Sequence, residues 1–113
     1  MADCLFCNMN DGSVAVDRVA ENKDAFAIRD ISPRAPIHTL IISRKHIPTA
    51  AEIEWGNAEE LAGMFVLASE VARIEGVSKS GYRLAFNVGE AAGMTISHLH
   101  LHLMGGRRLG AEG

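Results

Sequence analysis

Short apolar runs with partial alternation predict several β-strands in this chain. Two of them are separated by the polar residues 21–23 and are typical of a β-hairpin. A third run, His-Thr-Leu-Ile-Ile-Ser, follows two prolines that disfavour regular pairing, and it is rich in β-branched residues. A glycine-containing loop at 89–93 separates the last two runs. The five predicted strands cover residues 13–20, 24–29, 38–43, 81–88 and 98–104.

One long amphipathic helix is predicted at residues 58–75. Asn57 is expected to cap its start, and Glu59 and Glu60 lie in the first turn, where the helix dipole favours negative charge. Gly76 is expected to end it. The apolar positions spread over about half of the helix circumference, which is more than contact with one sheet requires. We therefore expect the helix to pack on its own sheet and also on a second copy of the chain.

Size and composition limit the possible classes of protein. A chain of 113 residues, 48% of them hydrophobic, is long enough for one domain with a substantial core, so disorder is excluded as its main state. We expect residues 1–113 to form a single domain with a flexible tail at 108–113. Eleven basic and fourteen acidic residues give a net charge of -3, which argues against nucleic-acid binding. Without a signal peptide or a long apolar run, we expect a cytoplasmic protein with no membrane contact.

Three histidines alternate with leucines in residues 98–104. On a strand, His98, His100 and His102 would share one face, about 7 Å apart, close enough to converge on one phosphoryl-sized group. Two chemistries fit this pattern. Either the central imidazole is a neutral nucleophile supported by its neighbours, or the three imidazoles bind a catalytic zinc with an open position for water. Crowding lowers the pKa of each imidazole, which favours the neutral form that both chemistries need.

The only two cysteines, Cys4 and Cys7, form a C-x-x-C motif near the start of the chain. In a reducing compartment this spacing indicates half of a metal site or a redox pair before a structural disulfide. The choice depends on partners elsewhere in the chain.

These motifs together resemble one known family. Residues 98–104 match the His-φ-His-φ-His-φ-φ signature of the histidine triad (HIT) superfamily, and the following Gly-Gly-Arg resembles its Hint-like branch. The cysteine pair and the segments 30–38, 43–47 and 87–95 fall in the same order and spacing as in Hint-like proteins. The resemblance implies an α+β, HIT-like fold with a five-stranded antiparallel sheet and one long helix. It also implies a homodimer whose sheets join into a continuous ten-stranded sheet.

The resemblance further implies a purine nucleoside phosphoramidase. Such an enzyme cleaves purine nucleoside 5'-phosphoramidates and acyl adenylates, and it releases AMP or GMP without a catalytic metal. By position, His100 would attack the α-phosphorus to form a covalent nucleotidyl-histidine, and His102 would bind the phosphate oxygens. His98 and His38 would set the tautomers of the neighbouring imidazoles, and Thr95 would help to protonate the leaving group.

The substrate-binding residues are carried over in the same way. Asp30 would accept hydrogen bonds from the ribose hydroxyls, and Asn87 with the backbone from Gly93 to Thr95 would hold the phosphate. Met94 stands where the family usually has glutamine, which removes a polar contact near the phosphate or the leaving group. An apolar clamp around the purine base would consist of Leu5, Phe6, Ile28, Ile31 and Leu40.

A structural zinc site follows from the resemblance to bacterial zinc-binding members. Cys4, Cys7, His46 and His98 would provide two thiolates and two imidazoles, a closed tetrahedral set that leaves no position for substrate. Two reduced cysteines without a metal remain the alternative.

Three other functions remain open at this stage. The chain would be a non-catalytic nucleotide-binding or protein-interaction module if it bound AMP with negligible turnover, which Met94 and the short tail favour. It would be a zinc hydrolase if chelation abolished its activity. The third is a dinucleoside polyphosphate hydrolase of the same superfamily.

Overall fold

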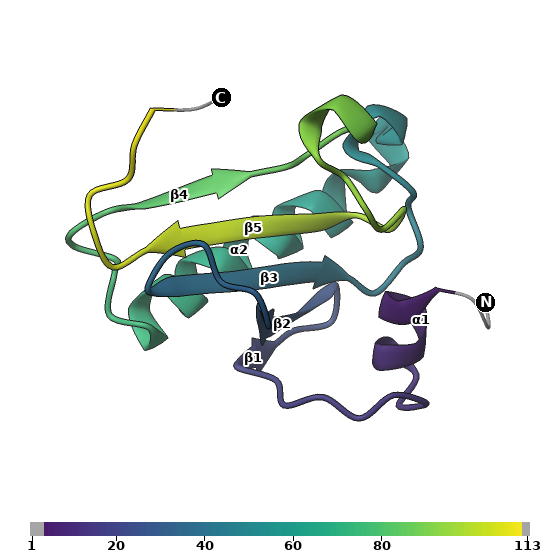
Figure 1. Cartoon of the computed structure of the whole chain (residues 1–113). Helices are drawn as coiled ribbons and strands as arrows, with labels where there is room; N and C mark the ends of the chain where they lie inside the picture. The colour runs from purple at the N-terminus through teal and green to yellow at the C-terminus, as the bar shows by residue number, and fades with distance from the viewer. Residues whose placement is uncertain (1–3, 112–113) are drawn as a thin grey trace.

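Five strands form one antiparallel sheet, with the long helix α2 lying across one of its faces (Figure 1). The computed structural model describes residues 4–111. The spatial order of the strands is β1-β2-β3-β5-β4, so β4 and β1 are the outer strands. Short 3-10 turns lie at Ala50–Glu52, Trp55–Asn57 and Glu90–Ala92. The helices and strands are α1 (Leu5–Asn10), β1 (Ala20–Glu21), β2 (Ala25–Arg29), β3 (Ile37–Ser43), α2 (Ala58–Ile74), β4 (Tyr82–Ala85) and β5 (His100–Gly105).

Side-chain alternation divides the sheet into two apolar layers. On the face toward α2, Leu101 and Leu103 of β5 pack with Ile41 of β3 against Leu67 and other helix residues. On the opposite face, Phe6 of α1 packs against the sheet in a smaller apolar cluster. The other members of this cluster are Phe26, Ile28, Leu40 and Ile42. The expected α+β fold with a five-stranded antiparallel sheet and one long helix is therefore confirmed.

Helix α2 depends on a glycine where the β1–β2 hairpin approaches it. A Cβ atom at Gly63 would lie 2.7 Å from Cγ of Asp24, which is closer than any real contact allows. The side-chain amide of Asn22 also donates to the carbonyl of Gly63 at 3.0 Å. The missing side chain thus lets the hairpin turn pack directly on the helix backbone. No helix within residues 4–111 is long and apolar enough to cross a membrane.

Two strand predictions were too long. Of the run 13–20, only Ala20 belongs to a strand, although Val19 still donates to the carbonyl of Ala27 in β2. Earlier residues follow α1 instead: Val14 donates to the carbonyl of Asn8, and Arg18 donates to that of Met9. Similarly, the strand expected at 81–88 is limited to Tyr82–Ala85. In both cases, the alternation of apolar and polar residues in the sequence extends beyond the residues that pair with a neighbouring strand.

The ends of the helices also differ from expectation. Asn57 does not cap α2 with its side chain, because its Oδ1 atom accepts the backbone N–H of Glu54 in the preceding 3-10 turn. The expected end of α2 is correct to within one residue, since Ile74 is the last helical residue. Helix α1 was not expected at all. Its N-cap is Cys4, whose sulfur accepts the backbone N–H of Cys7.

Candidate active site

The central and last histidines of the triad lie side by side on β5, on the face away from α2. Their ring centroids are 5.1 Å apart. Pairing with β3 sets their positions, since His100 lies opposite Ile42 and His102 lies opposite Leu40. His102 is buried and His100 is half-buried, so the pair borders solvent on the His100 side.

The first histidine points elsewhere, which corrects the expectation of three imidazoles converging from one strand. β5 begins only at His100. Before it, the carbonyl of Leu99 still accepts the backbone N–H of Ser43 of β3 at 3.2 Å, but the N–H of Leu99 donates to the carbonyl of Ile47 at 2.7 Å. The fully buried His98 ring faces Ser43, with its Nε2 atom 2.6 Å from the backbone carbonyl of that residue. Its other nitrogen faces the cysteines.

A backbone contact determines the tautomer of His100. Its Nδ1 atom lies 2.7 Å from the carbonyl oxygen of His98. Because a carbonyl oxygen only accepts, Nδ1 must carry the proton, which leaves a lone pair on Nε2 of the neutral ring. The resemblance assigned this role to the His98 imidazole, whereas the contact is made by the His98 peptide group. An imidazole held in this way presents a nucleophilic nitrogen away from the strand.

A similar chain of hydrogen bonds determines the tautomer of His102. The backbone N–H of Arg34 donates to Nδ1 of His38 at 3.1 Å, so the proton of a neutral His38 lies on Nε2. That nitrogen is 3.0 Å from Nδ1 of His102, which therefore accepts, and it also lies 3.5 Å from a carboxylate oxygen of Asp30. His102 must then carry its own proton on Nε2. The site thus combines a lone pair on one imidazole with an N–H donor on the next.

Burial keeps these imidazoles neutral. Burial, together with the neighbouring His100, lowers the pKa of His102 to about 4. Burial also lowers the pKa of His38, although the Asp30 carboxylate opposes this effect, and that of His98, although its hydrogen bond to Ser43 opposes it. The tautomer argument for His38 and His102, which requires neutral rings, therefore holds near pH 7.

A second cluster of donor atoms lies where α1 meets the start of β5. Nδ1 of His46 and Nδ1 of His98 are 3.1 Å apart. The sulfur of Cys4 is 3.3 Å from Nδ1 of His98, and that of Cys7 is 3.3 Å from Nδ1 of His46. These four side chains could hold a metal ion. Desolvation, followed by the neighbouring Cys4, raises the pKa of Cys7. The three triad histidines form no such common group within residues 4–111.

The remaining polar residues are only partly brought together. Asn87 lies 3.5 Å from Nε2 of His102, and Asp30 lies beside His38. Gly93 adopts a left-handed conformation at the end of a 3-10 turn, Met94 is half-buried, and Thr95 is exposed on the loop before β5. No recorded contact joins these three loop residues to the imidazoles.

Of the expected apolar clamp, Phe6, Ile28 and Leu40 lie in one cluster. Leu5 is 43% exposed, and Ile31 is 99% exposed and stands outside that cluster. Phe6 has an additional role that the sequence did not indicate. Its ring centroid lies 5.7 Å from that of His98 and 5.1 Å from that of His100, so it touches both the cysteine–histidine cluster and the candidate nucleophile.

The backbone groups that orient the imidazoles could not be predicted from the amino-acid sequence. Orientation of the imidazoles depends on peptide groups of His98, Ser43 and Arg34. Every residue offers the same peptide group, so no sequence signal distinguishes these three.

Comparison with known proteins agrees with this geometry. A family model described as "HIT domain" matches residues 12–109. The purine nucleoside phosphoramidase of Escherichia coli K12 is 36% identical over 108 residues, which cover 96% of this chain and 91% of that protein.

Solved structures with the same fold include two hydrolases. A HIT family hydrolase from Legionella pneumophila Philadelphia 1 superposes with a TM-score of 0.90 at 44% identity, covering 94% of this chain and 95% of its own. A HIT family hydrolase from Clostridium thermocellum has a TM-score of 0.94 at 39% identity, and the match covers 99% of this chain and 97% of that one.

The lowered pKa of His102 predicts a pH-dependent stability. Between the usual histidine pKa of 6.5 and about 4, the unfolded chain binds a proton at this residue that the folded chain does not. The free energy of unfolding therefore falls as the pH drops through this range, by at most about 3 kcal/mol from this residue. His102→Asn, which keeps an acceptor for His38, should remove that part of the slope.

The measurement is urea unfolding of both proteins between pH 4 and pH 7. His38 and His98 titrate in both, so their contributions cancel in the difference. If the free energy of unfolding fell in parallel for the two proteins between pH 7 and pH 4, the lowered pKa of His102 would be contradicted.

Proposed function

Because the chain belongs to the HIT domain family, we propose that it hydrolyses purine nucleoside 5'-phosphoramidates and acyl adenylates, releasing AMP or GMP. The phosphoramidase of E. coli at 36% identity and the HIT family hydrolases of matching fold support a hydrolase of this type. The observation that carries the proposal is the tautomer of His100, whose Nδ1 proton is bonded to a carbonyl and whose Nε2 lone pair is available.

The proposed reaction has two steps. In the first, Nε2 of His100 attacks the α-phosphorus, the bond from phosphorus to the leaving group breaks, and a nucleotidyl-imidazole forms while the leaving amine takes up a proton. In the second, water attacks the same phosphorus and loses a proton to solvent, the bond from phosphorus to Nε2 of His100 breaks, and AMP or GMP leaves. His102 donates its Nε2 proton in a hydrogen bond to the phosphate oxygens, whose negative charge grows in both transition states.

The polar residues around the imidazoles receive supporting roles. Asn87 and the backbone from Gly93 through Met94 to Thr95 hold the phosphate, and the exposed Thr95 hydroxyl passes a proton from solvent to the leaving group. Asp30 binds the ribose hydroxyls. Its contact with His38 supports this placement, since it puts the carboxylate one imidazole away from His102.

The apolar residues beside the imidazoles bind the purine base. Phe6, Ile28 and Leu40 are buried together on the histidine face of the sheet. Leu5 and Ile31 are exposed and would close over the base from outside.

Replacement of the nucleophile tests the covalent mechanism. His100→Ala should lower the turnover of a fluorogenic adenosine 5'-phosphoramidate by roughly a thousandfold or more, because the attacking nitrogen is lost. AMP binding should change far less, since the base and ribose contacts remain. The measurements are AMP release and calorimetric AMP affinity.

Exposed Lys79→Ala serves as the control and should retain full turnover. Unimpaired hydrolysis by His100→Ala would exclude this mechanism. If the wild-type chain bound AMP tightly but hydrolysed neither phosphoramidates nor acyl adenylates, a binding module would be the better description.

We further propose that the four-residue cluster holds a structural zinc ion. Tetrahedral zinc with nitrogen and sulfur ligands requires donor separations of roughly 3.3–3.8 Å. The separations of 3.1–3.6 Å among the sulfurs and nitrogens of Cys4, Cys7, His46 and His98 suit it. The hydrogen bond from Nε2 of His98 to Ser43 leaves Nδ1 free for a metal. The ion would tie α1 to the start of β5, while the chemistry stays with the imidazoles.

Metal analysis tests this site. The purified chain should contain about one zinc per chain, and Cys7→Ser should lose most of it and melt at a lower temperature. Lys45→Ala, next to His46, should keep its zinc. The zinc assignment fails if Cys7→Ser retains full metal content. It also fails if the wild-type protein is free of zinc after growth in zinc-supplemented medium.

The remaining proposal concerns assembly, a homodimer in which two sheets join along β4. Trp55, Phe65 and Val66 are 96%, 40% and 65% exposed on the α2 side. Trp55 and Phe65 border a hollow of about 620 Å³ with mainly apolar walls. Phe86, just after β4, touches Phe65 with ring centroids 6.1 Å apart. An exposed apolar helix face and an outer strand therefore lie on one side of the molecule, which suits a second copy.

Sedimentation tests the dimer. The wild-type chain should sediment with the mass of two chains, and Phe65→Glu should shift it toward one, because a charge would be buried at the contact. Ser78→Glu adds the same charge beyond the helix and should leave the dimer intact. A wild-type monomer at micromolar concentration would contradict the proposal.

A further inference from the structure

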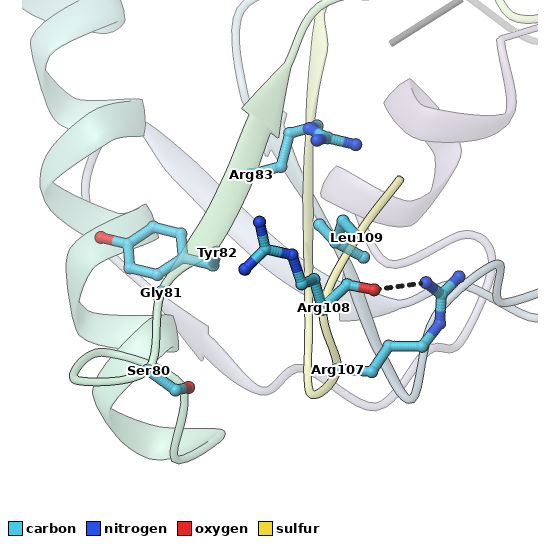
Figure 2. Close-up of a pocket in the computed structure, with 7 residues that line it drawn as sticks. All are labelled: Ser80, Gly81, Tyr82, Arg83, Arg107, Arg108 and Leu109. Carbon is cyan, nitrogen blue, oxygen red and sulfur yellow. Dashed lines mark hydrogen bonds between the residues drawn. The ribbon is translucent and has the colours of Figure 1, made fainter. Parts of the chain in front are cut away.

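An arginine-lined hollow lies at the end of the sheet where β4 begins and β5 ends, far along β5 from the metal cluster (Figure 2). Its volume is about 420 Å³. No acidic residue of the described chain lines it. The residues that do are Ser80, Gly81, Tyr82, Arg83, Arg107, Arg108 and Leu109. Figure 2 shows Arg108 turning its guanidinium toward β4, from which Arg83 extends.

Backbone carbonyls hold two of the guanidinium groups. Arg83 donates to the carbonyl of Gly110 at 2.8 Å. Arg107 donates through one nitrogen to Arg108 at 3.0 Å and through the other to Arg34 at 3.1 Å. A neutral carbonyl orients the Arg107 guanidinium without cancelling its charge, so Arg107 and Arg108 give the hollow a positive wall.

The other arginines near the sheet are arranged differently. Arg18 and Arg44 share the carboxylate of Glu21, and Arg29 pairs with Glu75. Arg107 and Arg108, by contrast, have no carboxylate within 4.0 Å among residues 4–111. Several cations around one hollow repel each other, and a bound anion would relieve that repulsion. Because the chain as a whole has a net charge of -3, this positive charge is a local feature of the hollow and indicates a binding site for an anion.

We propose that this hollow binds a small anion with two or more phosphate groups, such as inorganic pyrophosphate or the polyphosphate chain of a nucleotide. Guanidinium groups present paired N–H donors that match phosphate oxygens. The hollow of about 420 Å³ is larger than a single phosphate group fills. Binding here does not depend on the proposed hydrolase activity.

One residue connects this hollow to the imidazoles. The carbonyl of Arg34 accepts from Arg107, and its N–H donates to Nδ1 of His38 at 3.1 Å. His38 in turn contacts His102 at 3.0 Å. An anion that draws Arg107 toward itself therefore acts on the peptide group that orients His38. We expect the NMR signals of the His38 ring to move when the hollow fills.

The test is calorimetric titration of the full chain with pyrophosphate in the presence of saturating AMP, which occupies the proposed active site. Wild-type protein should bind pyrophosphate, and Arg107→Gln with Arg108→Gln should weaken this binding at least about tenfold. The matched control, Lys23→Gln with Lys45→Gln, removes the same charge at exposed positions that do not line the hollow, and it should change the affinity by less than about twofold. Sedimentation of each variant checks that assembly is unchanged, because β4 is an outer strand.

Amide NMR locates the anion. Supporting shifts fall in residues 80–83 and 107–109, together with the His38 ring. Shifts confined to His100 and His102 would overturn the proposal, as would equal weakening in the control variant or no pyrophosphate binding. Failure of AMP to bind would count against the proposed function alone, since the hollow can be titrated without it.

The source of the anion follows from a competition with ATP. If ATP displaces both AMP and pyrophosphate, the hollow receives part of the same molecule that occupies the imidazole site. If ATP displaces AMP but leaves pyrophosphate bound, the anion is a separate ligand. Both results support the site and differ only in its occupant.

Discussion

Strands β3 and β5 pair from Ile37 opposite Gly105 to Ile42 opposite His100, and most of the molecule depends on this register. Because strand side chains alternate, the same pairing sends Leu101 and Leu103 toward α2 and leaves His100 on the other face. A slip of one residue would exchange the two sets, burying imidazoles in the core and exposing leucines. The apolar core thus maintains the positions of the histidines, although none of its leucines touches a substrate.

The imidazoles acquire their chemistry from the peptide groups around them. A neutral imidazole has one donor and one acceptor, so fixing one nitrogen fixes the other. The carbonyl of His98 accepts a hydrogen bond from the protonated Nδ1 of His100, and the N–H of Arg34 begins the sequence of hydrogen bonds that leaves His102 as a donor. Burial keeps His102 and His38 neutral near pH 7, and these assignments require that state. Small displacements of backbone, rather than of charge, would therefore alter the site.

Both ends of β5 carry a polar cluster that is connected to the imidazoles through the backbone. At the start of the strand, His98 faces the cysteines with its ring and contacts His100 with its carbonyl. Beyond its end, Arg107 binds the carbonyl of Arg34, whose N–H contacts His38. The strand is thus held at two points that flank the histidine pair. This arrangement explains how residues outside the histidine pair can still affect the orientation of its two imidazoles.

The sequence by itself determined the elements with a clear period: the alternating triad strand, the strand at 38–43 and the helix at 58–75, where β3, β5 and α2 lie. It also determined the HIT family, through motifs of fixed order, and the membership of the four-residue metal cluster. Tertiary structure alone decided that the six-residue α1 forms, because Cys4 caps it and Phe6 packs on the sheet. It also turned His98 out of the ladder, 94 residues from the Cys4 it faces, and gathered the arginines at the other end. Periodicity records which face of an element a side chain occupies, whereas these contacts depend on how distant segments cross in space.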